Sequence, residues 1–156
     1  MATIYFDNNA TTAPAPEVVD ALLPYLRERY GNPSSLHQLG REAQTAVAAA
    51  RASVARLLGA SSPKQIVFTS GGSEGNQTAL RAGSRLNPSR KRILTTTVEH
   101  AAVLEPLAAF EADGWNVERV GVDAEGRLDA LAFAARIDVD CALVSGMWAN
   151  NETGGG

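Results

Sequence analysis

Short apolar runs rich in β-branched residues alternate with helix-length segments over the second half of the chain. We expect strands at Ile66–Thr69, Arg92–Thr97, Trp115–Val122 and Cys141–Ser145. We expect helices from the glycine turn after Ser70 to about Leu86, from Ala101 to Asp113 and from Leu128 to Ile137. Because parallel strands need long crossover connections, this alternation predicts an α/β fold with a mainly parallel sheet and helices on both faces.

The first part of the chain has a different pattern. Pro16 suits the first turn of a helix because that turn needs no amide donor. Gly31–Ser35 breaks the chain. Apolar and small residues then recur at helical spacing from Leu39 to Leu58, and Gly59 is placed to end that helix.

Composition restricts the partners of the chain. A net charge of -3, with 45% hydrophobic and 20% charged residues, is typical of a soluble globular protein. The only basic run, Arg90–Arg92, favours a surface turn over a nucleic-acid patch. The apolar stretches are too short for a membrane span, the first residues do not resemble a secretory signal, and one cysteine excludes an internal disulfide. We expect a cytoplasmic protein with no nucleic-acid partner, no membrane partner and no metal site.

The segment Phe68–Glu74 has the pattern of an anion site. A predicted strand runs through Gly71 and Gly72 into a helix, and glycines allow the backbone to approach a ligand closely. The first amides of a helix lack internal partners and lie at its positive end, so a phosphate fits there, with Ser73 as an added donor. The alternative is a helix start that Ser73 simply caps.

Two further polar segments follow predicted strands. His100, after the second strand, could stack on an aromatic ring or transfer protons, or it could merely begin a surface helix. Asn151, after the last strand, could bind a phenolic oxygen or a carboxylate, or it could belong to an ordinary Asn-rich turn. Ligands collect beyond the carboxyl ends of parallel strands, so one pocket would explain all three segments.

These motifs, in this order, resemble those of the cysteine desulfurases, which are fold-type I pyridoxal-phosphate enzymes of the aminotransferase class V family. The matching segments are Tyr5–Thr12, Gly31–His37 with Gly40, Ile66–Asn76, Glu99–His100 and Asn150–Gly154. The resemblance implies part of the large domain of that fold. It implies an N-terminal helical segment, 1–60, that contributes to the active-site edge, and the first part of the cofactor-binding α/β domain, 61–156.

The resemblance also implies roles for individual residues. Gly72 and Ser73 would hold the phosphate of pyridoxal 5'-phosphate. His100 would stack on the pyridine ring and act in catalysis, and Asn151 would contact the ring hydroxyl and the substrate carboxylate. The implied reaction removes sulfur from L-cysteine and leaves alanine and an enzyme persulfide. The implied partners are a sulfur acceptor or iron–sulfur scaffold protein, and a second copy of the enzyme in a homodimer.

Other parts of the family pattern are missing from these 156 residues. Neither Lys64 nor Lys91 matches the Schiff-base lysine, and Cys141 falls in a predicted strand rather than in a mobile loop. We therefore expect an N-terminal fragment, a truncated product or one half of a split enzyme, inactive alone. The alternatives are a non-catalytic binding or assembly module that retains the shape of the pocket, and a relative similar to selenocysteine lyases.

Overall fold

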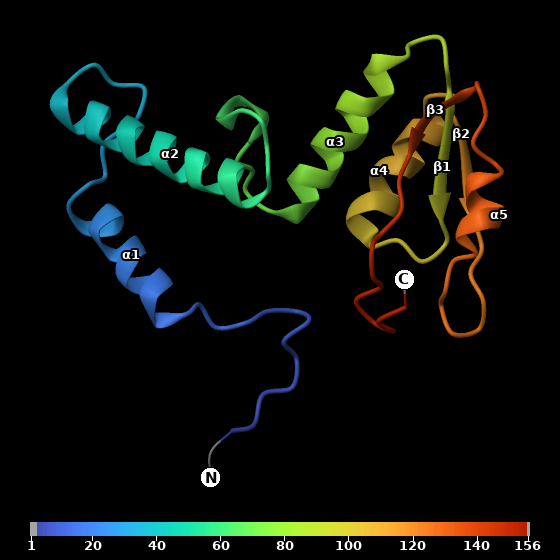
Figure 1. Ribbon diagram of the computed structural model, residues 1–156, viewed down its shortest axis with the longest axis horizontal. Coiled ribbons are helices and arrows are strands. Elements are labelled where there is room, and N and C mark those ends of the chain that lie inside the picture. Colours follow the sequence, from blue (N-terminus) through green and yellow to red (C-terminus); the bar gives the residue numbers. More distant parts are fainter. Residues whose placement is uncertain (1–2, 156) are drawn as a thin grey trace. The chain divides into compact units, whose positions relative to one another are not determined.

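Three parallel strands form the sheet of the computed structural model, which describes residues 3–155 (Figure 1). The strand order is β2–β1–β3, with β1 hydrogen-bonded to both neighbours. The strands are β1 (Arg92–Thr96), β2 (Asn116–Val120) and β3 (Cys141–Val144). The helices are α1 (Pro16–Arg27), α2 (Gln38–Leu57), the 3-10 turn η1 (Pro63–Gln65), α3 (Gly72–Leu86), α4 (Ala101–Ala112) and α5 (Ala130–Ala134). The predicted α/β class and the parallel sheet are confirmed.

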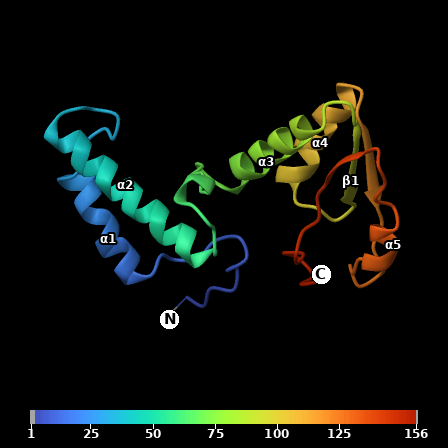
Figure 2. The ribbon, with the colours of Figure 1, turned by 45° about the horizontal axis from the view of Figure 1, so that its top comes forward.

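Apolar side chains of β1 alternate between two small cores, one on each face of the sheet. Ile93 is fully buried against α3 and α4, in a cluster with Leu80, Val103 and Leu107. Leu94 is fully buried on the other face, with Val120, Phe133 of α5 and Cys141. Helices therefore cover both faces, as Figure 2 shows for α4 and α5. Only Ile93 and Leu94 of this strand are apolar, but Thr95 and Thr96 are buried as well.

The chain divides into two compact units between Phe68 and Thr69. The predicted division between residues 60 and 61 lies a few residues earlier, and the roles assigned to the two parts remain predictions. Among residues 3–155, no helix combines the length and the apolar character needed to cross a membrane.

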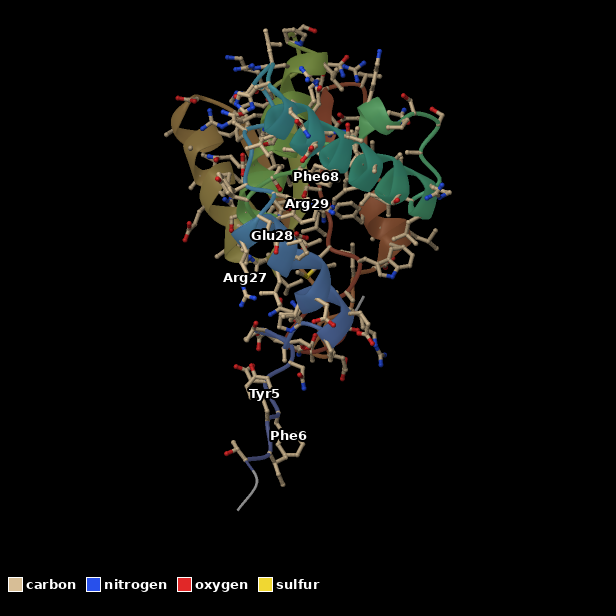
Figure 3. The ribbon with its side chains drawn as sticks, turned by 90° about the vertical axis from the view of Figure 1, so that its left-hand side faces the viewer. Tyr5, Phe6, Arg27, Glu28, Arg29 and Phe68 are labelled. Atoms are coloured by element: carbon tan, nitrogen blue, oxygen red, sulfur yellow. The ribbon has the colours of Figure 1, made fainter. Side chains whose placement is uncertain are left out.

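The first unit contains an irregular N-terminal segment, which carries Tyr5 and Phe6 (Figure 3), followed by α1, α2 and η1. A tight loop joins α1 to α2. A Cβ atom at Gly31 would lie 2.3 Å from the carbonyl oxygen of Leu39, and one at Gly40 would lie 2.2 Å from that of Ser35. No larger residue fits at either position, so the glycines of the motif at 31–40 are required by backbone packing. His37 ends the loop as the N-cap of α2.

The prediction of a buried strand at Ile66–Thr69 is wrong. The segment is irregular, and the side chains of Val67 and Phe68 are exposed. An apolar run becomes a strand only if another strand accepts its backbone hydrogen bonds, and none of the described strands pairs with it. The guanidinium of Arg51 instead donates to the Ile66 carbonyl and lies over the Phe68 ring, 4.8 Å from its centroid.

Most other predicted elements lie within one or two residues of those observed. The exception is the last helix, expected from Leu128 to Ile137, which covers only Ala130–Ala134. Asp129 accepts hydrogen bonds from the amides of Leu131 and Ala132, so the helix begins after this cap rather than at Leu128.

Candidate functional site

The N-terminus of α3 presents backbone amides without a side-chain cap. Gly71 is the N-cap residue and makes no side-chain hydrogen bond, and the helix begins with the bond from the Gly75 amide to the Gly71 carbonyl. A Cβ atom added at Gly71 or Gly72 would meet no heavy atom within 4 Å. Ser73 lies inside the helix and is not its cap. The alternative in which Ser73 caps this helix is therefore excluded.

Glu74 stabilises the turn that precedes these amides. Its carboxylate accepts a hydrogen bond from the Ser70 amide at 2.6 Å, and this bond holds the pKa of Glu74 below its ordinary value. The carboxylate is thus ionised at neutral pH. It satisfies an amide outside the helix and leaves the amides of Gly72 and Ser73 to an external acceptor.

His100 is the N-cap of α4. Its Nδ1 accepts a hydrogen bond from the Ala102 amide at 3.0 Å, which fixes the ring, and the side chain is exposed. A neutral imidazole that accepts at Nδ1 carries its proton on Nε2. The ring therefore presents an N–H donor and a flat face from a fixed position. His100 thus begins a surface helix, as the alternative interpretation predicted. That position still allows the ring to stack on a ligand and to donate from Nε2.

Ser73 and the first turn of α4 line a common hollow with a volume of about 400 Å³. Its remaining walls come from the facing sides of α3 and α4. The lining residues are Ser73, Gln77, Ala101, Ala102, Glu105, Pro106 and Ala109. In Figure 1, β1 ends at the lower edge of the sheet and α4 begins there. Of the residues predicted to form the site, only Ser73 lines this hollow, and the turn that follows His100 lines it from the α4 side.

Asn151 lies in the exposed turn after β3 and is not part of the lining of that hollow. Its Nδ2 donates to the carboxylate of Glu152 at 2.6 Å. The preceding residue attaches the turn to the chain after β1, because Nδ2 of Asn150 donates to the Val98 carbonyl at 3.1 Å. The turn that contains Asn151 is therefore attached, through Asn150, to the segment that precedes His100.

A family model described as aminotransferase class-V matches residues 4–155. The chain belongs to this family. It is 52% identical over 155 residues to a cysteine desulfurase of Cereibacter sphaeroides, covering 99% of this chain and 40% of that protein. It is 47% identical over 154 residues to cysteine desulfurase NifS of Azotobacter vinelandii, covering 99% of this chain and 38% of that protein. The class-V chain therefore spans about 40% of the length of these relatives.

Solved structures show the same fold. A NifS-like protein superimposes with a TM-score of 0.90 at 39% identity, over 96% of this chain and 41% of the other. A structure titled SspA in complex with cysteine gives a TM-score of 0.88 at 31% identity, over 96% of this chain and 43% of the other. Both agree with the resemblance to the cysteine desulfurases found in the motifs.

Membership of this family implies pyridoxal 5'-phosphate as the cofactor. Two features of this chain fit the chemistry of that cofactor. The uncapped N-terminus of α3, with open space around Gly71 and Gly72, suits a phosphate. The exposed and fixed ring of His100 suits stacking on an aromatic ring.

Two residues that connect the parts of this site belong to the matching motifs but were given no role from the sequence. Glu99 is buried, and one of its oxygens accepts from the Thr96 hydroxyl at 2.9 Å and from the Met147 amide at 2.8 Å. Asn150 organises the turn that contains Asn151. Their position directly before His100 and Asn151 was the only available signal, since a partner 48 residues away cannot be identified from spacing.

Proposed function

We propose that this chain holds the phosphate and ring of pyridoxal 5'-phosphate within a cysteine desulfurase that removes sulfur from L-cysteine. The uncapped N-terminus of α3 is the observation that carries the proposal. Side chains cap α2, α4 and α5, whereas the N-caps of α1 and α3 make no side-chain hydrogen bond. At α1 the first helical residue is Pro16, which has no amide donor, whereas α3 begins with Gly71 and Gly72 in open space. The names of the relatives support the desulfurase activity.

Different residues bind different parts of the cofactor. The amides of Gly72 and Ser73 bind the phosphate with the positive end of the α3 dipole, and the Ser73 hydroxyl adds a donor. The His100 ring stacks on the pyridine ring and holds a proton on Nε2, because Nδ1 is occupied by the Ala102 amide. Asn151 contributes an amide for the ring hydroxyl or the substrate carboxylate. When bound, the cofactor supplies an electron sink for the α-carbon of the amino acid.

These 156 residues do not complete the reaction in our proposal. Lys64 lies in η1, in the first unit, and Lys91 precedes β1. Cys141 is only 7% exposed, and its thiol donates to the Leu143 carbonyl at 3.3 Å, so it cannot serve as a mobile nucleophile. A lysine and a cysteine outside this segment provide the covalent chemistry. The persulfide sulfur then passes to an acceptor such as an iron–sulfur scaffold protein, and the active enzyme is a homodimer.

The phosphate site is tested by adding a negative charge to it. Gly72→Asp places a carboxylate in the first turn of α3, where it favours the helix but repels a phosphate. A Cβ atom at this position meets no neighbour, so the fold should persist. We expect the affinity for pyridoxal phosphate to fall at least about tenfold, since a charge repulsion of about 1.4 kcal/mol has this effect. Ser89→Asp, which adds the same charge in the loop before β1, is the control.

The measurement is a fluorescence or calorimetric titration with pyridoxal phosphate and, separately, with pyridoxal, which lacks the phosphate. Pyridoxal should bind the native chain and Gly72→Asp equally weakly. Borohydride treatment followed by mass spectrometry should find no specific adduct on Lys64 or Lys91. The proposal would be contradicted by a native chain that does not bind pyridoxal phosphate, or by a Gly72→Asp variant that binds it as tightly as the native chain.

A further inference from the structure

The chain that follows β3 is fastened to the end of β1 by a buried carboxylate. Glu99 is 7% exposed, and its Oε1 accepts from Thr96 Oγ1 at 2.9 Å and from the Met147 amide at 2.8 Å. A buried carboxylate is costly to desolvate unless donors compensate it, so both bonds favour a single placement of this side chain. Thr96 belongs to β1 itself, whereas Met147 lies beyond β3. Glu99 therefore joins segments that are far apart in the sequence.

A second side chain makes a parallel attachment. Nδ2 of Asn150 donates to the Val98 carbonyl at 3.1 Å. Its Oδ1 accepts from the amides of Glu152 and Thr153 at 2.8 and 3.0 Å, which closes the turn locally. One end of the Asn150 side chain thus shapes the turn, and the other end ties it to the residue before Glu99.

The hydrogen bonds from Glu99 to Met147 and from Asn150 to Val98 form what we call the loop clamp. His100 directly follows Glu99, and Asn151 directly follows Asn150. His100 and Asn151 are therefore each one peptide unit, about 3.8 Å between Cα atoms, from a clamped residue. The clamp limits how far the imidazole and the Asn151 amide can move apart before a ligand binds.

We propose that Glu99 and Asn150 are positioning residues that hold His100 and Asn151 at a fixed separation for the cofactor ring. This inference rests on the proposed function and extends it to residues that do not touch the cofactor. Neither residue contributes to the phosphate site at the start of α3. The clamp therefore acts on binding of the ring and leaves binding of the phosphate unaffected.

A matched pair of variants tests the carboxylate. Glu99→Gln keeps an oxygen that can accept from both donors, whereas Glu99→Met has a similar length and no comparable acceptor. In NMR hydrogen exchange, we expect the Met147 amide to exchange at least about tenfold faster in Glu99→Met and within about threefold of the native rate in Glu99→Gln. This measurement needs no cofactor, so it tests the clamp even if the proposed function fails.

Asn150→Asp provides an independent test that does not alter the buried carboxylate. An aspartate still accepts from the amides of Glu152 and Thr153, but it cannot donate to the Val98 carbonyl. The turn should therefore keep its own hydrogen bonds and lose its attachment. This variant also covers the case in which Glu99→Met fails to fold.

Ligand titrations separate positioning from a general loss of structure. We expect Glu99→Met and Asn150→Asp to bind pyridoxal phosphate about tenfold more weakly and inorganic phosphate with native affinity, and Glu99→Gln to bind both normally. Equal losses for both ligands, unchanged exchange of the Met147 amide in Glu99→Met, or a Glu99→Gln variant as impaired as Glu99→Met would each overturn the inference. A native chain that binds neither ligand, with the exchange result as expected, would refute the proposed function and leave the clamp intact.

Discussion

Substitution of Gly126 tests whether the connection between β2 and α5 supports the turn that carries Asn151. Gly126 lies in that connection with φ +80, and its amide donates to the Asp123 carbonyl at 3.0 Å. A Cβ atom at Gly126 would lie 3.0 Å from Oγ1 of Thr153 and 3.6 Å from its Cγ2. The β2–α5 connection therefore packs directly against the turn after β3. Gly126→Ala should push that turn away.

A control with the same backbone geometry separates the backbone strain of Gly126→Ala from its contact with Thr153. Gly114 has φ +81, and a Cβ atom there meets nothing within 4 Å. An alanine at positive φ costs about 1–2 kcal/mol, partly offset by about 0.4–1 kcal/mol from the less flexible unfolded chain. We thus expect Gly114→Ala to lower the free energy of unfolding by about 1 kcal/mol.

Gly126→Ala should cost more because Thr153 must move by a few tenths of an ångström. Oγ1 of Thr153 accepts from the Gly155 amide at 3.2 Å, and that bond would weaken. One such hydrogen bond contributes about 0.5–1.5 kcal/mol. The variant should therefore be about 1 kcal/mol less stable than Gly114→Ala, giving a total loss of about 2 kcal/mol.

Urea unfolding followed by circular dichroism measures both free energies, and ¹H–¹⁵N NMR locates the change. We expect shifts of the Thr153 and Gly155 amides in Gly126→Ala and none in Gly114→Ala. Equal destabilisation of the two variants, together with unshifted Thr153 and Gly155 amides in Gly126→Ala, would refute the argument that the β2–α5 connection supports the Asn151 turn.

Two other predictions concern the scaffold. Leu107 is fully buried, and Leu107→Ala removes three carbons at about 0.8 kcal/mol each and leaves a cavity. Urea unfolding should therefore show a loss of about 3–4 kcal/mol in the free energy of unfolding. The control Leu131→Ala, at a site that is 85% exposed, should change that free energy by less than about 0.5 kcal/mol, and equal losses would contradict the assigned core. Hydrogen bonds from Arg92 and Arg136, at 2.6 and 2.7 Å, hold the pKa of Glu118 below its ordinary value of 4.5. The stability that Glu118 provides is therefore complete above that value and is lost as the pH falls below it, so Glu118→Gln should flatten the decline between about pH 5 and pH 3, and an unchanged acid limb would count against this.

The local elements were largely predictable because their signals are local. Pro16 at the start of α1, the helical spacing of α2 and Gly114 after α4 are properties of a few neighbouring residues. Strand β1 was also recognisable, because Ile93 and Leu94 are followed by the β-branched residues Thr95 and Thr96, which suit a strand. The same reasoning failed at Ile66–Thr69, where the composition suits a strand but no described strand pairs with it.

The site was predictable in its parts and not in its connections. The glycine turn before α3, His100 and Asn151 were all identified as polar or flexible residues beside predicted strands. Gly71 is the N-cap because the first hydrogen bond along α3 joins the Gly75 amide to the Gly71 carbonyl, and the sequence does not show where that bond lies. That Asn151 lies in a turn held by Asn150 depends on Val98, which is 52 residues away along the chain from Asn150.

Most of the helices and strands, the parallel arrangement of the strands and the residue types that follow each strand could be predicted from the sequence, with Ile66–Thr69 as the exception. These properties follow from periodicity, from backbone preferences and from the length of the connections. The fold alone reveals that a buried Glu99 and the side chain of Asn150 join two separate loops, and that Gly126 packs against one of them. Such contacts require distant backbone groups to meet at hydrogen-bonding distance, and the order of residues along a chain does not specify that meeting.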